Sequence, residues 1–479
     1  MENKGKKRTN IALLFAAALS VFSAFSFVYN DMKIQTAWAR IFLDGVESGT
    51  IRRYAELVEQ GFPACPNNYS LFYNICMALW FAPLRIAERL SGGVIAEFVW
   101  FAWFKLLILL CFALCTLLIA KILKKLGKDE ESIGNLLFLF LVSPVTQYAG
   151  IAIGQVDCFS LVLMLAAVHA LLDERYGRMC FLVSLSLMFK PFVLFAFLPI
   201  FFLRFYREPV KMFRYGAVTL SMPALMQLLG RTYFIDYEQK RSFYDSLFHF
   251  PDRILGGSIY ETAPFVTLFC ILLYFCARKC SENKCTRKDD LLFPFCGILL
   301  FLLFSEWSAH WIVYLSFFLL FCALLAKRKQ DVLLLYLVLG IFYPLYVVSK
   351  WPAELDMGML GGALLTQLSG IRYDGHELGW FVGNHLIDVK YAVIICRSVI
   401  TAALLLLSLP VLRLFKGKGE EAFGIDGKEG AVSDGKKKNG SNRSAEFRLE
   451  KKEEKLLLYA QCIPWLLFLG AVWILAMKG

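Results

Sequence analysis

Long apolar runs recur along this chain, and they limit its fold more than any other feature. The runs are about 15 to 25 residues long, the length that a helix needs to cross the hydrocarbon core of a membrane. Hydrophobic residues make up 58% of the 479-residue chain and charged residues only 19%, a lower charged share than a soluble protein of this size carries. The sequence therefore predicts an all-α, polytopic helix bundle embedded in a membrane.

The basic residues between these runs predict the topology. The net charge is +12, but the Lys and Arg side chains lie in short loops, where they favour the cytoplasmic side of a membrane. We therefore interpret the charge as a topology signal and expect no nucleic acid as a partner. A cytoplasmic N-terminus and about 13 crossings place the basic loops on the cytoplasmic side. The residues expected there include Lys4, Lys125, Arg175, Arg207, Lys284 and Lys329.

A hydrophilic segment near the C-terminus separates the last apolar run from the others. Residues 1–415 are predicted to form one integral membrane domain. Residues 416–455 mix Lys and Arg with Asp and Glu and lack apolar periodicity. They have little apolar surface to bury, so we expect this cytoplasmic segment to be partly disordered. Residues 456–479 form the last predicted transmembrane helix.

A long amphipathic segment, Asp31 to Gly93, follows the first apolar run. Trp38, Ile41 and Phe42 fall at helical spacing, and charged residues lie among them. This pattern is typical of helices that lie on a membrane surface or dip into it. We therefore predict an amphipathic first outer loop; a hairpin within the membrane is the alternative.

Polar residues interrupt the apolar runs in the centre of the chain. Gly154-Gln155-Val156-Asp157 separates two runs, and Lys190-Pro191 interrupts the run from Phe181 to Leu203. Basic residues flank both ends of this last run, so one straight span would violate the charge rule. Pro191 instead favours two short segments that meet at Lys190. Ionisable residues at such depth are costly unless they face protein or water, which makes Asp157 and Lys190 candidates for a functional site.

The predicted topology gathers polar residues without a simple role in charge placement on the outer side: Asp31, Asp157, Lys190, Glu306 and His310. Four of these residues also have a purely structural interpretation. Asp31 can end a span at the interface, and Asp157 can cap the helix that follows it. Lys190 can extend to the interface, and His310, which is flanked by tryptophans, can belong to an interfacial aromatic belt.

This arrangement resembles the GT-C class of polytopic glycosyltransferases, and more closely the bacterial relatives of the GPI-anchor mannosyltransferases. The residues that carry the resemblance are Asp31, Gly154-Gln155-Val156-Asp157, Lys190-Pro191 and the stretch from Glu306 to Tyr314 with His310. The resemblance spans residues 10–325 and rests on the order and sidedness of these elements. The family usually has a charged-aromatic pair after the His, and here Trp311-Ile312 takes its place.

The resemblance implies a membrane glycosyltransferase that uses a polyprenyl-phosphate-linked sugar. It would move mannose or another hexose to a glycan, lipid or protein acceptor on the outer face of the cell membrane. It implies Asp31 as the base for the acceptor hydroxyl, and Asp157 is the second catalytic candidate. The leaving phosphate needs a cation or hydrogen-bond donors, and the expected substrate-binding residues are Gln155, Lys190, Glu306 and His310. No residue is assigned as a metal ligand, and a requirement for a divalent metal stays open.

Two other functions remain open at this point. A transporter or flippase for lipid-linked sugars would also place polar residues in a membrane cavity, although the long first outer loop and the lack of repeated halves disfavour it. A polysaccharide polymerase or ligase would share the substrate class, and outer-loop residues such as Arg231 and Arg372 are consistent with it. Asp31 and Asp157 in one outer-facing cavity would favour the transferase. A central cavity open to alternate sides would favour transport.

Overall fold

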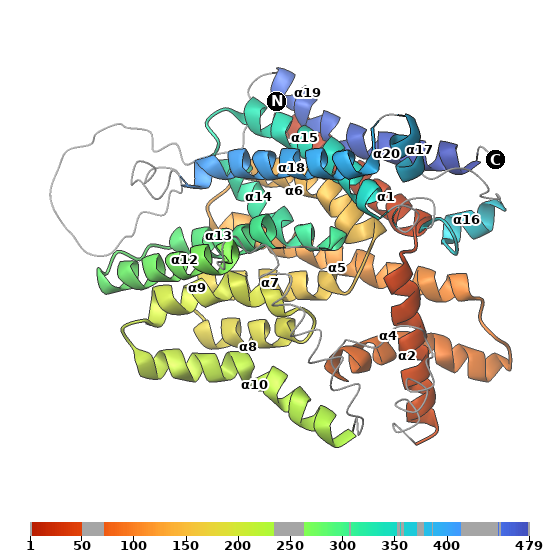
Figure 1. Ribbon diagram of the computed structural model, residues 1–479, viewed down its shortest axis with the longest axis horizontal. Coiled ribbons are helices and arrows are strands. Elements are labelled where there is room, and N and C mark those ends of the chain that lie inside the picture. Colours follow the sequence, from red (N-terminus) through yellow and green to blue (C-terminus); the bar gives the residue numbers. More distant parts are fainter. Residues whose placement is uncertain are drawn as a thin grey trace.

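Every regular element in the described part of the chain is helical. The computed structural model describes residues 2–49, 71–233, 263–305, 308–351, 355, 359–370, 378–385, 387–412, 449 and 452–477. Within these ranges the chain forms α-helices, short 3₁₀-helices and one π-helix, and it forms no β-strand. The predicted all-α class is therefore confirmed. Most of the long helices run in one common direction (Figure 1).

The helix bounds follow the apolar runs of the sequence. The first part of the chain forms α1 (Glu2–Ser26), α2 (Asn30–Glu47), α4 (Leu71–Ser91), α5 (Glu97–Lys125), α6 (Glu130–Val142), the π-helix η1 (Val145–Ala152), α7 (Asp157–Leu172), α8 (Tyr176–Leu187), η2 (Pro191–Val193), α9 (Leu194–Phe205) and α10 (Pro209–Tyr233). The second part forms α12 (Pro264–Ser281), α13 (Asp289–Phe304), η3 (Ala309–Ile312), α14 (Val313–Leu325), α15 (Lys329–Lys350), α16 (Leu364–Ser369), α17 (Leu378–His385), α18 (Val389–Leu412), α19 (Lys452–Tyr459), η7 (Ala460–Cys462) and α20 (Ile463–Met477).

Six helical spans among the described residues are long and apolar enough to cross a membrane: α1, α5, α12, α15, α18 and the continuous segment from α19 to α20. A seventh results if α6 and η1, which bend by 58° at their junction, count as one span. Pro144 at that junction lacks an amide hydrogen and so interrupts the helix. Shorter apolar helices are α7, α8, η2 with α9, and η3 with α14. The chain is thus a multi-pass membrane protein.

The predicted break at Lys190-Pro191 is present. Helix α8 ends at Leu187, Lys190 is extended with φ −147° and ψ 122°, and η2 begins at Pro191. The ring of a proline disfavours helical geometry in the residue before it, which explains the extended lysine. The two segments form a helical hairpin, as the sequence predicts.

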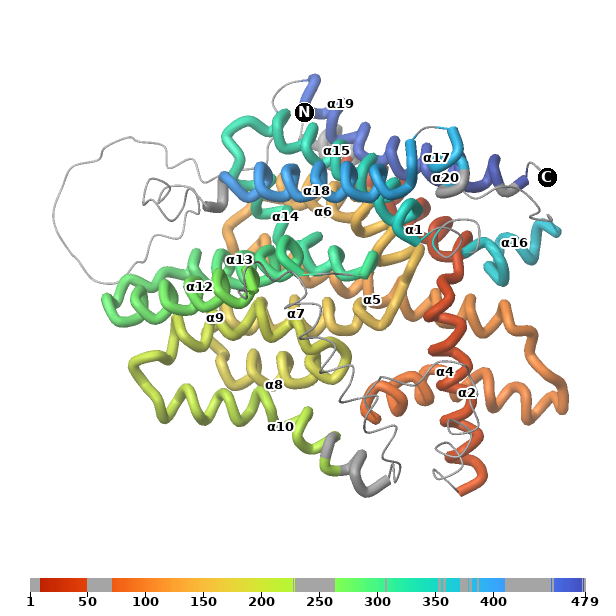
Figure 2. Tube along the Cα trace, in the orientation of Figure 1, coloured from red at the N-terminus to blue at the C-terminus, as the bar shows by residue number. Residues whose placement is uncertain are grey.

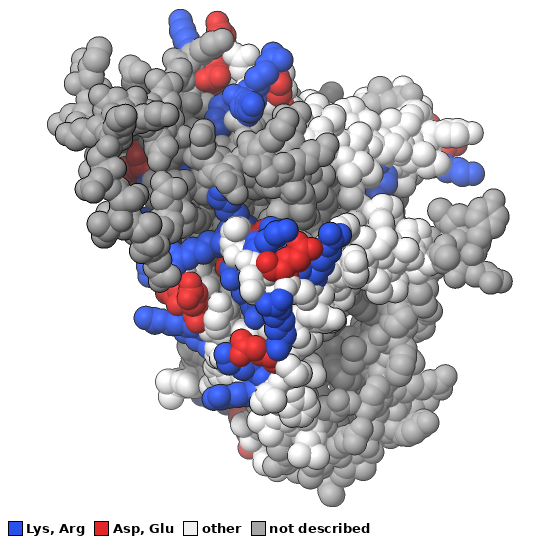
Figure 3. All heavy atoms as spheres, turned by 90° about the vertical axis from the view of Figure 1, so that its left-hand side faces the viewer, with Lys and Arg blue, Asp and Glu red and all other residues white. Residues whose placement is uncertain are grey.

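The ends of α5, α7, α9 and α12 meet on one face of the bundle, which we call the basic end. It is defined by Lys125, Arg207, Lys284 and Arg287. Arg207, after α9, donates to Asn283 at 2.8 Å, and Arg287 pairs with Glu174, ahead of α8, at 3.3 Å. Both ends of the α8–α9 hairpin therefore lie beside the loop that follows α12. Figure 3 shows Lys and Arg gathered with acidic residues on this face.

Helices α2 and α4 form an amphipathic pair. Helix α2 runs across the direction of the long helices (Figure 1). Trp38 and Phe42 of α2 cluster with Ala78 of α4, and Arg85 of α4 pairs with Glu47 of α2 at 3.2 Å. The buried apolar face and the ion-paired polar face match the predicted amphipathic segment, and neither α2 nor α4 is among the helices apolar enough to cross a membrane.

The two ends of the described chain pack against each other. Figure 2 shows the N-terminal helix in red beside the C-terminal helix in blue. The indole N–H of Trp465 in α20 donates to the hydroxyl oxygen of Ser23 in α1 at 2.8 Å. The ring of Trp465 also lies 5.5 Å from the ring of Tyr148 in η1. The last helix thereby packs over the contact between α1 and η1. Asp31 follows α1 in the chain, and Gln155 and Asp157 follow η1.

Candidate functional site

Asp31 lies in the first turn of α2, beside Gln155. The chain leaves helical geometry at residues 27–29, between α1 and α2, and the N–H of Val28 donates to the carbonyl of Met359 at 2.6 Å. This contact fixes the start of α2 and leaves the Asp31 side chain half-buried. The amide nitrogen of Gln155 donates to Oδ2 of Asp31 at 2.6 Å. The amide thus orients the carboxylate that the family resemblance implies as the base.

A tight turn at Gly154 sets the position of Gln155. Gly154 has φ +54°, and a Cβ at this position would lie 2.8 Å from the carbonyl oxygen of Ile151. Only glycine adopts this geometry without strain and without that clash. The turn leads from η1 into α7 and places Gln155 and Asp157 two residues apart at the start of that helix.

Asp157 is the buried centre of a second charged group. Its exposed fraction is 2%. Its Oδ2 atom lies 3.3 Å from Nζ of Lys190 and 3.6 Å from Nε2 of His310. Within the described part of the chain neither carboxylate oxygen of Asp157 accepts a hydrogen bond, and the N-cap residue of α7 is Val156. The capping interpretation of Asp157 is therefore wrong, because its carboxylate faces Lys190 and His310 instead of the first turn of its own helix.

Aromatic side chains surround this charged group. The hydroxyl of Tyr314 donates to the backbone carbonyl of Asp157 at 3.4 Å. The ring of Phe192 packs edge-on against Tyr314, with centroids 4.7 Å apart, and lies 4.9 Å from the ring of Trp311. In such apolar surroundings the attraction between the carboxylate and the Lys190 ammonium is stronger than in water.

The structure brings the described candidates together in two linked groups, Asp31 with Gln155 and Asp157 with Lys190 and His310. The Gly154–Asp157 turn joins the groups. Four helices begin beside them: α2 at Asn30, α7 at Asp157, η2–α9 at Pro191 and η3–α14 at Ala309. The sixth candidate, Glu306, lies outside the described residues.

Two further cations support the turns of the site, and the sequence interpretation missed both. Lys105 of α5 is 1% exposed and donates to the carbonyls of Ile151 and Ala152, at 2.8 and 2.5 Å. Arg397 of α18 donates to the carbonyls of Leu302 and Ser305, at 3.1 and 3.3 Å. Each is an ionisable residue inside a long apolar run, and that signal alone was enough to single it out.

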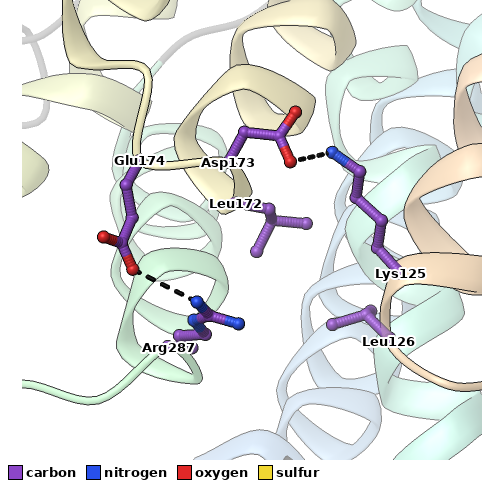
Figure 4. A pocket seen from close by; sticks show the side chains of 6 residues that line it. All are labelled: Lys125, Leu126, Leu172, Asp173, Glu174 and Arg287. Carbon is purple, nitrogen blue, oxygen red and sulfur yellow. Dashed lines mark hydrogen bonds and ion pairs between the residues drawn. The ribbon is translucent and has the colours of Figure 1, made fainter.

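A cavity of about 340 Å³ lies at the basic end and is separate from this site (Figure 4). Lys125 pairs with Asp173 on one side of it, and Arg287 pairs with Glu174 on the other. The hydrogen bond from Lys125 lowers the pKa of Asp173. Asp173 follows Asp157 by the full length of α7, about 24 Å at 1.5 Å per residue. The cavity is thus remote from the candidate acids.

The donor atoms of the described residues do not form a recognisable metal centre. No group of three or more His, Cys, Asp or Glu side chains within the described ranges is placed to hold a metal ion. At Asp157 the neighbouring groups are a lysine and a histidine.

A scan against protein-family models found no match, and searches of curated proteins and of solved structures found none either. The function is therefore inferred from the geometry of the chain's own residues.

Proposed function

We propose that the chain is a membrane glycosyltransferase of the GT-C type, which moves mannose or another hexose from a polyprenyl-phosphate carrier to an acceptor hydroxyl. The acceptor is a glycan, a lipid or a protein. One observation carries the proposal: a half-buried carboxylate, Asp31, is held by Gln155 next to the turn that carries the Asp157–Lys190–His310 group. A base and a cation for a phosphate are thereby available at neighbouring positions.

Asp31 acts as the general base. The bond between the acceptor oxygen and the sugar C1 forms while the bond between C1 and the carrier phosphate oxygen breaks. The proton of the acceptor hydroxyl passes to Asp31, and the electron pair of the broken bond stays on the carrier phosphate. The amide of Gln155 donates to Oδ2 and so holds the carboxylate in place while it accepts the proton of the acceptor hydroxyl.

Lys190 and His310 bind the carrier phosphate. Asp157 holds both groups on one carboxylate oxygen, so their positions are set before the donor arrives. A positive charge placed in advance stabilises the negative charge that develops on the leaving phosphate. The aromatic surroundings of Phe192 and Trp311 strengthen this interaction because they exclude water.

The membrane arrangement supports a lipid-linked donor. If each shorter apolar helix also crosses, together with α10 and α13, the count reaches the about 13 crossings expected from the basic loops. The N-terminus and the basic end are then cytoplasmic, and the site faces the outer side of the cell membrane. The amphipathic pair α2–α4 carries Asp31 at the height where a carrier phosphate meets water.

The direct test is an assay of purified protein with a panel of radiolabelled polyprenyl-phosphate sugars and candidate acceptors. We expect one donor to yield labelled acceptor together with free polyprenyl phosphate. Asp31→Asn keeps the shape of the side chain but removes the base, so the rate should fall about 10²–10⁴-fold while donor binding persists. Asp44→Asn is the matched control on the same helix, because the Asp44 side chain is 48% exposed and pairs with Arg85 of α4.

Two outcomes would contradict the proposal. Full activity in Asp31→Asn would remove the base assignment. Movement of an intact donor across sealed vesicles, without cleavage of its sugar–phosphate bond, would identify a flippase.

A further inference from the structure

Lys105 is a lysine at membrane depth that the proposed reaction does not use. It belongs to α5, one of the six helices long and apolar enough to cross a membrane, and it is 1% exposed. An ammonium group in such a position is costly unless hydrogen bonds or an opposite charge compensate for its lost hydration. Lys105 must therefore have partners that repay this cost.

The partners are the last two carbonyls of the π-helix. Nζ of Lys105 lies 2.8 Å from the carbonyl oxygen of Ile151 and 2.5 Å from that of Ala152. The final carbonyls of any helix lack partners within the helix and need donors from elsewhere. Here one side chain supplies two donors, and both bonds come from a helix that is distant in sequence.

The same ammonium lies against the inside of the Gly154 turn. A Cβ at position 154 would lie 2.9 Å from Nζ of Lys105. The chain thus folds closely around the ammonium before it reaches Gln155 and Asp157. Cγ1 of Ile108, also in α5, would lie 3.5 Å from that Cβ.

We propose that Lys105 is a positioning residue, which holds the Gly154–Asp157 turn so that Gln155 reaches Asp31 and Asp157 reaches Lys190. The inference deepens the proposed function and rests on it for its kinetic consequence. Lys105 acts on the site indirectly, through its hydrogen bonds to the carbonyls of Ile151 and Ala152. It therefore affects both groups of the site at once, whereas each of Gln155 and Lys190 affects only one.

Lys105→Met separates positioning from bulk packing. Methionine keeps an unbranched side chain of similar length and removes the donors. The carbonyls of Ile151 and Ala152 lose their partners in this variant. Leu107→Met, two residues further along α5 and 8% exposed in the native protein, is the control for a methionine in this helix.

Cys158 reports on the turn without any assay of activity. It follows Asp157 directly and is 2% exposed, and Cys322 of α14, at 0% exposed, reports on the bundle. The full-length protein in detergent is treated with N-ethylmaleimide, and the labelling rate of each cysteine is measured by peptide mass spectrometry. We expect Lys105→Met to raise the rate at Cys158 by about tenfold or more, as local opening of the turn predicts, with no change at Cys322.

Equal protection of Cys158 in the native protein and in Lys105→Met would overturn the proposal. So would a parallel rise at Cys322, because Lys105 would then support the whole bundle. Lys105→Gln keeps an N–H donor with a shorter reach and provides a second variant if the methionine protein does not fold. The Cys158 labelling rate of Lys105→Gln should lie between the rates of the native protein and of Lys105→Met. A Cys158 rate equal to the native rate, together with a raised rate at Cys322, would also overturn the proposal.

The kinetic arm is a double-mutant cycle with Gln155→Leu. If Lys105 acts through Gln155, Lys105→Met should lower the transfer rate about tenfold in the native background and about threefold or less in the Gln155→Leu background. Additive losses would overturn the proposal. If the native protein transfers no sugar from any donor, the proposed function fails, while the Cys158 measurement still decides the role of Lys105.

Discussion

The amide of Gln155 donates a 2.6 Å hydrogen bond to the carboxylate of Asp31, although 124 positions of sequence separate the two residues. The contact joins the start of α2 to the turn between η1 and α7. One side-chain hydrogen bond thus joins two segments that lie far apart in the sequence. The position of the base depends on both of them.

Gln155→Leu tests this contact. Leucine keeps a similar volume but cannot donate, and a hydrogen bond to a charged group contributes about 1.5–3 kcal/mol. If that energy orients the base in the transition state, the transfer rate should fall about 10–100-fold at saturating donor, with normal expression. Gln155→Glu should lose more, because it places a second carboxylate against Asp31. Rates equal to the native rate in both variants would show that the contact plays no part in catalysis.

Lys190→Met should weaken donor binding. The substitution removes a positive charge from the proposed phosphate site. Asp157 then keeps its contact with His310 but loses its ion pair with Lys190. A buried charge that loses its partner destabilises a protein by about 3–5 kcal/mol, so the melting temperature in detergent should also fall. In the double variant Lys190→Met/Asp157→Asn the melting temperature should recover while donor affinity stays low. Recovery of both properties would argue against a phosphate role for Lys190.

Gly154→Ala should destabilise the protein and lower its activity. A non-glycine residue in the left-handed region costs about 1–2 kcal/mol, and the new Cβ would also lie too close to the Ile151 carbonyl and the Lys105 ammonium. Thermal unfolding in detergent measures the effect. Gly216→Ala in α10 is the control, since nothing lies within 4 Å of its added Cβ and alanine is the better helix former. Equal stability changes in both variants would contradict the strain at Gly154.

The ion pair between Lys125 and Asp173 should contribute to stability at neutral pH and lose that contribution in acid. The hydrogen bond from Lys125 lowers the pKa of Asp173 in the folded protein. A lowered carboxyl pKa stabilises the fold above the unfolded pKa, near 3.9, and this stability disappears as the pH falls through the folded value.

Asp173→Asn should therefore unfold more easily than the native protein at pH 7, by about 1 kcal/mol or less for a pair that water partly screens. The difference should begin to shrink as the pH falls below about 4 and should vanish below the lowered pKa of Asp173 in the folded protein. Glu174→Gln is the control at the same cavity, because the pair of Glu174 with Arg287 is 59% and 54% exposed and should contribute little at any pH. A difference that persists in acid would assign the effect to packing.

Local sequence patterns predicted the helices and their breaks well. The α8–α9 break at Lys190-Pro191 follows from the covalent restrictions of proline, which act between neighbouring residues. The amphipathic character of α2 and α4 follows from helical periodicity. The number of membrane spans is harder to predict. Helix α7, for example, has 16 residues, about 24 Å of helix, which is shorter than the hydrocarbon core of about 30 Å. Whether such a helix crosses depends on how it packs in the bundle.

The site was predicted as a set of residues but not as a set of contacts. Sidedness placed Asp31 and Asp157 together, yet no spacing rule gives the hydrogen bond from Gln155 to Asp31 or the pairing of Asp157 with Lys190. Asp157 has the sequence signature of an N-cap, and tertiary partners override it. The place of Lys105 inside the apolar run of α5 could have marked it as a candidate, but its contacts could not be predicted, because its partners are backbone carbonyls.

The four helices that begin beside the site have an electrostatic consequence of their own. Each helix start carries the positive end of a macrodipole, equivalent to roughly +0.5 elementary charge. Helices α2, α7, η2–α9 and η3–α14 direct these ends toward Asp31, Asp157, Lys190 and His310. The backbone therefore creates a positive potential there that no side-chain substitution removes. An anionic group therefore retains some attraction to this end of the bundle even when Lys190 is replaced.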